Sequence, residues 1–523
     1  MSTLTRPAPP FVQRPPSPSL RMYAWVKRFN RPVVAVLAVG LIAGYLRFMH
    51  LAYPEHRVFD EYYYTKSACI LLGYSNQRCD INSADERFWR ENEWDTGAWV
   101  HPPLGKWMIA LGELAFGTES MGWRAGAAVT GTATVMLLAV IIQLLWASPI
   151  WTFTGGLLLA TESLNLVQSR TGTLDIFVAF WVVLVFVFLL LDRRWIERRT
   201  PPPVPAMDGP SDAEAGVQPR RRLPAPLWRP YRFAAGAAGG AAMATKWSGL
   251  TAFVTAIALG FLWEVMRRKR FGTSKPIVTT ITTEGFGFVL ALLLTPAIVY
   301  FATYIPWFLH FGWDLQRWAE MQGRAARFHA DLKAVNDQGQ PWHAYFAPAW
   351  KWIVLARPTY YYGAFGPEGV RQVIYAQGNP AIFWGSLLAI PYVAVAWWRT
   401  RDWRAGFVIV TIAGLYLPWF LVSRPQFFFY ATPLTPFFVL ACVYALRDLS
   451  ELHVAGSRSR PFLPFVVGFV AASVTAEALA TSIRYALSDE ADRADRANRA
   501  AAFAREQLHV DVIGRRYEEL YGT

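Results

Sequence analysis

The chain has 523 residues, of which 54% are hydrophobic and 15% aromatic, and its net charge is +14. So apolar a composition excludes an ordinary soluble multidomain protein. The positive charge does not indicate nucleic-acid binding, because the arginine clusters lie between long apolar segments, where they are typical of membrane topology.

Residues 1–32 are rich in proline and are predicted to form a disordered cytoplasmic tail. The apolar run that follows is long enough to remain as a membrane anchor, so no cleaved signal peptide is expected. Residues 176–191, IFVAFWVVLVFVFLLL, show the character of the later runs. Only helices satisfy their backbone groups inside such segments, so the fold class is an all-α polytopic membrane protein.

The length that a bilayer requires predicts about 11 spans. They lie near residues 33–53, 122–146, 150–168, 172–191, 232–245, 248–266, 283–308, 379–398, 404–422, 427–447 and 461–485. With this count, every arginine cluster between spans falls in the cytoplasm, as the positive-inside rule requires. The N-terminus is then cytoplasmic and the protein is a multi-pass protein of the plasma membrane.

This topology divides the chain into a transmembrane domain and its loops. The domain spans 33–485, with outer loops 54–121 and 309–378, a cytoplasmic loop 192–231, and a charged extracytoplasmic helix or tail at 486–523. Cys69 and Cys79 share the first outer loop and could form a disulfide in an oxidising compartment, with free thiols as the equal alternative.

Charged residues near the outer ends of the spans are few, and an adjacent pair of carboxylates, Asp60 and Glu61, stands out among them. Two such groups at the rim of a membrane cavity can accept a proton from a hydroxyl or orient a polar substrate. Other charged or titratable residues are predicted on the same side: His101, Lys106, Arg124, Arg170, Asp175, Lys246, Arg357 and Arg424.

Cations on the outer side run against the positive-inside rule, so each needs a reason. Ion pairing or contact with lipid headgroups explains any one of them, and Arg170 with Asp175 fits a structural pair. Several cations converging on one cavity would instead bind a lipid phosphate and stabilise it as a leaving group. Arg124, Lys246 and Arg424 are the best candidates for that role.

His101 and Lys106 belong to the motif HPPLGK, in which two prolines forbid helix before them and start one after them. The motif fits a structural corner, and a role for His101 in the site stays open. No spacing typical of a metal site is present, so no metal or other cofactor is predicted, and a divalent ion at Asp60 and Glu61 is the minority interpretation.

The chain resembles the protein O-mannosyltransferases, in particular their actinobacterial single-chain members. The resemblance runs from the first predicted span to the tenth. It rests on FDEYYYTKSA (59–68), VHPPLGKWMIALGE (100–113), GWRAGAAVTG (122–131), QSRTGTLD (168–175), ATKWSGL (244–250), AWKWIVLARPTYYY (349–362) and RPQFFFYATPLTPFF (424–438).

The resemblance implies a GT-C type glycosyltransferase that moves mannose from polyprenyl-phosphate-mannose to Ser or Thr of secreted proteins on the outer face. It implies Asp60 as the catalytic base, Glu61 as an orienting carboxylate, Arg124 as a functional arginine and Arg424 as a donor-phosphate ligand. The expected reaction is a single inverting displacement without a metal. A carboxylate with an ordinary pKa near 4 would serve as the base without special tuning.

Three other functions stay open. A related GT-C enzyme could transfer another lipid-linked sugar, such as an arabinose, to a lipid or polysaccharide. A lipid-sugar flippase would carry polar residues at mid-depth in the membrane, whereas here they lie mainly at the outer ends. A membrane scaffold would leave the outer cations unexplained.

Overall fold

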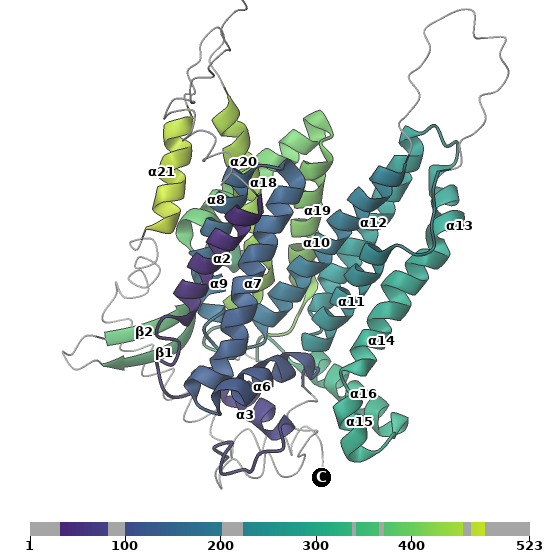
Figure 1. Cartoon of the computed structure of the whole chain (residues 1–523). Coiled ribbons are helices and arrows are strands. Elements are labelled where there is room, and N and C mark those ends of the chain that lie inside the picture. The colour runs from purple at the N-terminus through teal and green to yellow at the C-terminus, as the bar shows by residue number, and fades with distance from the viewer. Residues whose placement is uncertain are drawn as a thin grey trace, which may run out of the picture.

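The computed structural model describes residues 32–81, 100–200, 223–336, 341, 343–365, 371–452 and 462–475. The predicted tails at 1–32 and 486–523 therefore lie almost wholly outside the described residues. Within those residues the protein is a bundle of helices with a single hairpin at its lower edge (Figure 1).

In the described part of the chain, seven helical segments are long and apolar enough to cross a membrane. They are α7 (Ser120–Trp146), α10 (Asp175–Arg199), α12 (Gly249–Arg270), α13 (Pro276–Val289) continued through the π-turn η2 (Leu290–Leu294) into α14 (Thr295–Ala302), α18 (Pro380–Thr400), α19 (Trp403–Tyr416) with the 3₁₀ turn η3 (Leu417–Leu421), and η4 (Phe428–Leu434) with α20 (Thr435–Glu451). The protein is thus a multi-pass membrane protein.

Shorter helices account for the other predicted spans. These are α2 (Pro32–Phe48), α8 (Pro149–Ala160) followed by α9 (Ser163–Gln168), α11 (Pro230–Thr245) and α21 (Leu463–Val474). Each predicted span coincides with a helix as far as the chain is described. Because only seven segments among the described residues are long enough by this measure, the count of 11 stays a prediction.

The long loops hold further structure, which gathers at one end of the bundle, the lower end in Figure 1. We call it the loop end and the opposite end the far end. It contains α3 (Glu61–Leu71), α6 (Leu104–Phe116), α15 (Ile305–Phe311), α16 (Leu315–Asp331), α17 (Trp350–Ile353) and the hairpin of β1 (Thr359–Phe365) and β2 (Arg371–Ala376). Cys69 and Cys79 form a disulfide there, which decides the alternative that the sequence left open.

The hairpin was not predicted. Its strands are antiparallel, from Thr359 opposite Ala376 to Phe365 opposite Arg371, with an irregularity between Tyr360 and Tyr362. The extra residue, Tyr361, is buried and its ring stacks on Phe59 with 4.5 Å between centroids. The hairpin is therefore attached to the segment that leads into the acidic pair.

The centre of the bundle is α10, which is buried on most sides and packs against α7, α11 and α12. Its neighbour α11 is made mainly of alanine and glycine, so other backbones approach it closely. A Cβ atom on Gly236 would lie 1.8 Å from the carbonyl oxygen of Ala291 in η2. Small residues in α11 thus allow η2 and α14 to pack against it.

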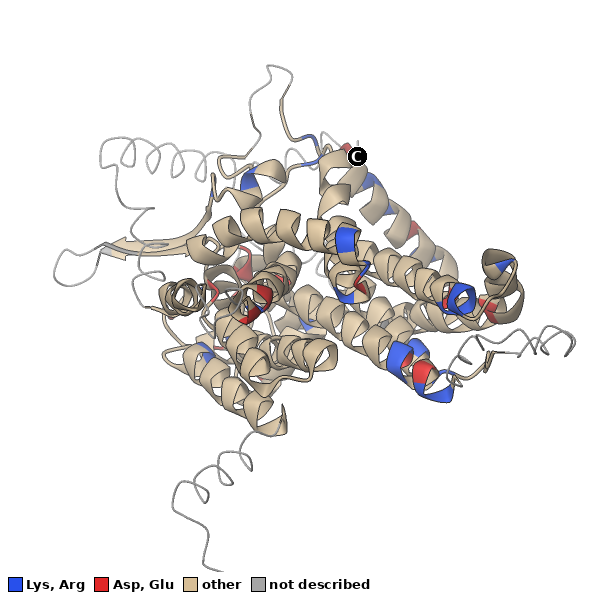
Figure 2. Ribbon diagram, turned by 90° about the horizontal axis from the view of Figure 1, so that it is seen from above, with Lys and Arg blue, Asp and Glu red and all other residues tan. Residues whose placement is uncertain are grey.

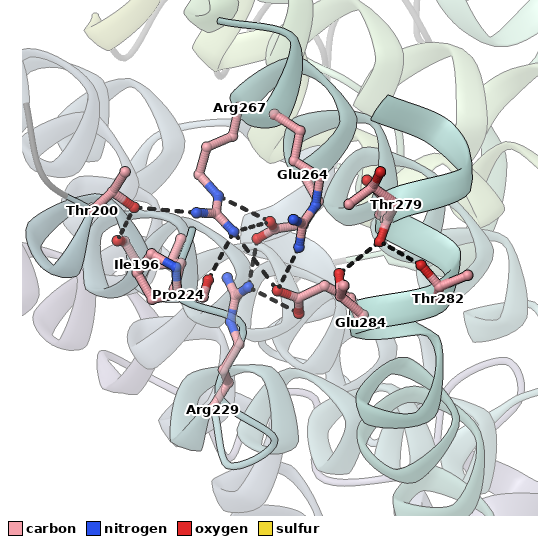
Figure 3. Close-up of polar contacts among 12 residues, drawn as sticks. Ile196, Thr200, Pro224, Arg229, Glu264, Arg267, Thr279, Thr282 and Glu284 are labelled. Atoms are coloured by element: carbon pink, nitrogen blue, oxygen red, sulfur yellow. Dashed lines mark hydrogen bonds and ion pairs between the residues drawn. The ribbon is translucent and has the colours of Figure 1, made fainter. Parts of the chain in front are cut away.

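The far end contains a buried network of charges (Figure 3). Arg229 binds Asp192 at 2.6 Å and Glu264, while Glu284 accepts from Arg232 at 2.8 Å. Arg267 and Arg268 complete the network, which ties α10, α11, α12 and α13 together. Seen from this end, basic and acidic residues lie next to each other at the helix ends (Figure 2).

Replacing Glu284 by Gln should destabilise the protein strongly. The side chains of Glu284 and its partners are at most 4% exposed, so the change removes one carboxylate from a buried cluster of arginines and leaves them only Asp192 and Glu264 as counter-charges. We expect the free energy of unfolding to fall by about 3–5 kcal/mol. Thermal unfolding in detergent measures the effect, and Glu451→Gln, which breaks an exposed pair with Arg447, is the control and should cost below about 1 kcal/mol. Equal melting temperatures for the two variants would contradict the assignment.

Candidate active site

The acidic pair lies at the loop end, where the chain leaves α2 and enters α3. Phe59 has a left-handed backbone with φ of 48°, which turns the chain sharply, and Asp60 is the N-cap residue of α3. The two adjacent carboxylates therefore point into different surroundings. They have different partners and different chemistry.

Glu61 is buried and every oxygen of its carboxylate is bound. Oε1 accepts from Nε of Arg124 at 2.8 Å and from the backbone N–H of Gly172 at 2.7 Å. Oε2 accepts from Nη2 of Arg124 at 2.8 Å and from the backbone N–H of Val58 at 2.9 Å. This bidentate ion pair, at most 1% exposed, locks the start of α3 onto α7.

Arg124 uses its remaining donors on the same segment. Nη1 donates to the carbonyl oxygens of Leu51 and Pro54, and Nη2 donates to that of His56. The predicted phosphate-binding role therefore does not agree with this geometry: a guanidinium whose donors are already bound, and which is buried, is not free to bind a phosphate. Arg124 and Glu61 together hold residues 51–61 in place.

Arg170 has a similar structural role. Its guanidinium donates to the carbonyl oxygens at the end of α2 and just beyond it, those of Leu46, Arg47, Met49 and His50. These are carbonyls that a helix end leaves without intrahelical partners. The predicted pair of Arg170 with Asp175 is not formed, because Asp175 binds another cation.

That cation is Lys246, which follows α11, while Asp175 begins α10. Nζ of Lys246 lies 2.9 Å and 3.1 Å from the two oxygens of Asp175, and both side chains are buried. The ammonium also lies 4.3 Å from the ring centroid of Tyr430. The packing of α10 on α11 thus places a buried ion pair at the loop end of the bundle.

Asp60 faces this ion pair, and its carboxylate has no hydrogen bond or ion pair with any residue that the structure describes. Burial raises the pKa of Asp60 to about 7; the nearby charge of Asp175 raises it further, and that of Lys246 opposes the rise. The expectation of an ordinary pKa near 4 is therefore wrong. Asp60 is a stronger base than a solvated carboxylate.

Arg424 is the second cation of the site. Nη2 donates to Oη of Tyr430 at 3.0 Å, and Nη1 lies 2.8 Å from Nδ1 of His329 in α16. His329 stacks on His101, with 5.2 Å between ring centroids. Burial, together with the charges of Lys246, Lys106 and Arg424 and the neighbouring His329 ring, keeps the pKa of His101 well below its usual value, so its ring is neutral.

The side chains of two predicted residues, Lys106 and Arg357, do not bind Asp60, Asp175, Lys246 or Arg424. Nζ of Lys106 donates to the carbonyl oxygen of His101 at 2.8 Å, so it holds the HPPLGK corner, and burial lowers its pKa to about 7. Arg357 is exposed and donates to the carbonyl oxygen of Ala344. Their arrangement indicates structural roles.

The structure thus brings together Asp60, His101, Asp175, Lys246 and Arg424, a cluster that we call the site group. Four neighbours were not among the predicted site residues: Tyr64, His329, Tyr361 and Tyr430. The pKa values of Tyr64 and Tyr361 are raised well above 10 by burial, and the charge of Asp60 adds to both rises. Three tyrosines stand in the quoted motifs, but nothing in the sequence pointed to His329.

The arrangement combines a carboxylate that has no partner in the described part of the chain with two cations, one of which is already paired with Asp175. Such a group suits a reaction in which a hydroxyl loses a proton and an anionic leaving group departs. Asp60 is able to take the proton, and Lys246 with Arg424 supplies the positive charge.

Comparison with known proteins agrees with this chemistry. The family described as dolichyl-phosphate-mannose-protein mannosyltransferase matches residues 37–200. The chain is 30% identical over 477 residues to the polyprenol-phosphate-mannose–protein mannosyltransferase of Mycobacterium tuberculosis, covering 84% of this chain and 85% of that protein. The corresponding protein of Mycolicibacterium smegmatis is 30% identical over 444 residues, covering 79% and 81%.

A solved structure shares the fold. The S. cerevisiae protein O-mannosyltransferase Pmt1–Pmt2 complex bound to the sugar donor matches with a TM-score of 0.60 and 14% identity, covering 86% of this chain and 90% of that one. The fold is therefore of the GT-C type, as the sequence predicted. Together with the identity shared over most of the chain, these matches show that the protein belongs to the protein O-mannosyltransferase family of membrane glycosyltransferases.

Proposed function

We propose that this chain transfers mannose from polyprenyl-phosphate-mannose to Ser and Thr hydroxyls of secreted proteins. The observation that supports this most is the half-buried carboxylate of Asp60, which faces the Lys246–Asp175 pair and has no partner among the residues that the structure describes. The relatives that align over most of the chain are named for this reaction. They favour it over the transfer of another lipid-linked sugar.

The reaction is a single inverting displacement. The acceptor hydroxyl oxygen attacks the anomeric carbon of mannose while its proton moves to Asp60. The bond between that carbon and the phosphate oxygen breaks, and polyprenyl phosphate leaves with the electron pair. Because an alcohol is a much weaker acid than a carboxylic acid, proton transfer accompanies the attack.

Lys246 and Arg424 bind the phosphate and stabilise the charge that develops on it. Arg424 offers planar paired donors, while Lys246 offers a compact charge. Asp175 binds the ammonium of Lys246 through both carboxylate oxygens and fixes its position. The neutral ring of His329 contacts Arg424, and the neutral ring of His101 stacks on His329, so neither ring repels the cations.

The catalytic face is the loop end, which we place outside the cell membrane, with the N-terminus in the cytoplasm. The distribution of arginines supports this orientation. So does the disulfide of Cys69 and Cys79, since disulfides persist in oxidising compartments.

Reconstitution tests the proposal. Purified protein in liposomes, given polyprenyl-phosphate-mannose and a Ser/Thr-rich peptide, should yield a peptide heavier by one hexose in mass spectrometry. Turnover should persist with EDTA, since the scheme uses no metal. The proposal fails if the wild-type protein makes no glycopeptide with this donor but does so with a lipid-linked arabinose.

The pH dependence of the reaction tests the role of Asp60. Only the ionised carboxylate is a base, and with a pKa of about 7 its fraction rises from about a tenth at pH 6 to about nine tenths at pH 8. The value of kcat/KM for the donor should therefore rise about tenfold per unit below pH 7 and level off above pH 8. Initial rates at low donor concentration measure this profile, and a flat profile from pH 5.5 to 8 would contradict it.

A further inference from the structure

His329 joins three parts of the site that are far apart in the sequence. It lies near the end of α16, and its Nε2 is 2.9 Å from the carbonyl oxygen of Val100, just before the HPPLGK corner. Its Nδ1 is 2.8 Å from Nη1 of Arg424. The ring stacks on His101 and meets the edge of Trp247, with centroids 5.8 Å apart.

These contacts allow only one protonation state of the ring. A carbonyl oxygen can only accept, so Nε2 of His329 must carry a hydrogen and donate to Val100. A guanidinium can only donate, so Nδ1 must be unprotonated and accept from Arg424. The ring is therefore neutral, in agreement with a pKa that burial, together with the charge of Arg424, lowers to about 4.

A neutral acceptor has a specific advantage beside this arginine. A carboxylate in the same place would hold the guanidinium equally well but would cancel its charge. Histidine holds Nη1, and the hydroxyl of Tyr430 holds Nη2, so the guanidinium is fixed in one orientation and keeps its full positive charge. That is the state in which an arginine binds an incoming phosphate best.

We propose that His329 is a positioning residue for the donor: its neutral Nδ1 fixes the guanidinium of Arg424 in the orientation that binds the phosphate of the lipid-linked sugar. This inference rests on the proposed function and adds to it a residue from the second long loop. It also gives α16 a function, because this helix contributes His329 to the donor site from the loop end.

Two substitutions separate the two hydrogen bonds of His329. In His329→Asn, the amide oxygen can take the place of Nδ1 and still accept from Arg424, while the bond to Val100 is lost. In His329→Gln, the amide nitrogen can take the place of Nε2 and still donate to Val100, while the bond to Arg424 is lost. The pair therefore distinguishes positioning of Arg424 from anchoring of α16.

The measurement is the donor KM and kcat of each variant in the liposome assay, with polyprenyl-phosphate-mannose as the varied substrate. We expect the donor KM of His329→Asn to stay within about threefold of wild type and that of His329→Gln to rise about tenfold. In an Arg424→Ala background the donor KM should no longer differ between His329→Asn and His329→Gln, because the guanidinium that residue 329 positions is absent. His50→Asn, at an exposed position with a left-handed backbone that Asn tolerates, is the control and should match wild type.

Each other outcome overturns the inference. A larger defect in His329→Asn than in His329→Gln would show that the bond to Val100 is the one that counts. Equal donor KM values in the two variants, or a difference that persists without Arg424, would show that His329 does not act through Arg424. Failure of the wild-type protein to transfer mannose would instead refute the proposed function, so the two failures are distinguishable.

Discussion

Replacing Asp60 by Asn is expected to abolish mannosyl transfer while the protein stays folded and binds its donor. Asn has nearly the same shape but cannot take a proton from the acceptor hydroxyl. Loss of a general base costs typically about 100- to 10,000-fold in rate. The donor KM should change little, because the phosphate is held by Lys246 and Arg424. Initial rates of glycopeptide formation by purified protein measure the loss.

The same substitution should raise thermal stability, which separates it from a damaging change. The pKa of Asp60 is about 7 in the folded protein and near 4 when unfolded, so the folded state binds the proton more tightly. The ionised carboxylate therefore costs stability, and this cost grows as pH rises from about 4 to about 7. We expect Asp60→Asn to melt at a higher temperature than wild type at pH 8, with a smaller difference at pH 5.

A matched control lies five residues away. Glu55 is exposed in the same loop, so Glu55→Gln should leave both rate and melting temperature unchanged. Substantial turnover by Asp60→Asn would eliminate Asp60 as the base. A lower melting temperature would show that its carboxylate is a structural group.

The helices were predictable because the bilayer imposes a length and an apolar composition on each of them. The far-end arginines were predictable as a class from the positive-inside rule. Their partners were not predictable, because the rule concerns the side of the membrane on which arginines lie and says nothing of their contacts. Arg229 binds Asp192 and Glu264, which lie 37 and 35 residues away. The hairpin was not predicted because its run of tyrosines is equally typical of a membrane interface.

In the site, the sequence identified the charged residues but could not assign their partners. Asp60 and Glu61 are neighbours with the same chemistry, and only the turn at Phe59 and the approach of Arg124 decide which carboxylate binds the arginine. Lys246 finds Asp175, 71 residues away, because α10 packs on α11. His329 had no signal at all, since it reaches Val100 across 229 residues and Arg424 across 95.

Replacing Arg124 by Ala should destabilise the segment 51–61 that leads into α3. The substitution decides whether this arginine is structural or binds the donor phosphate. The change leaves Glu61 buried without its cation and removes the donors that bind three carbonyl groups. Removing one partner of a buried ion pair typically costs about 3–5 kcal/mol in the free energy of unfolding. Thermal unfolding in detergent should therefore show a large fall in melting temperature, along with loss of transfer.

The double variant Glu61→Gln with Arg124→Leu tests the cause. It removes both charges, so it should be more stable than Arg124→Ala even though it has lost the same ion pair, because no carboxylate is left buried alone. Transfer should stay low in both, since Asp60 is held by the segment that this pair fixes. If Arg124 were a phosphate ligand, Arg124→Ala would keep the wild-type melting temperature and raise only the donor KM. That result would show that Arg124 is a donor ligand. The position of Glu61 would then depend on its hydrogen bonds from the backbone N–H groups of Val58 and Gly172.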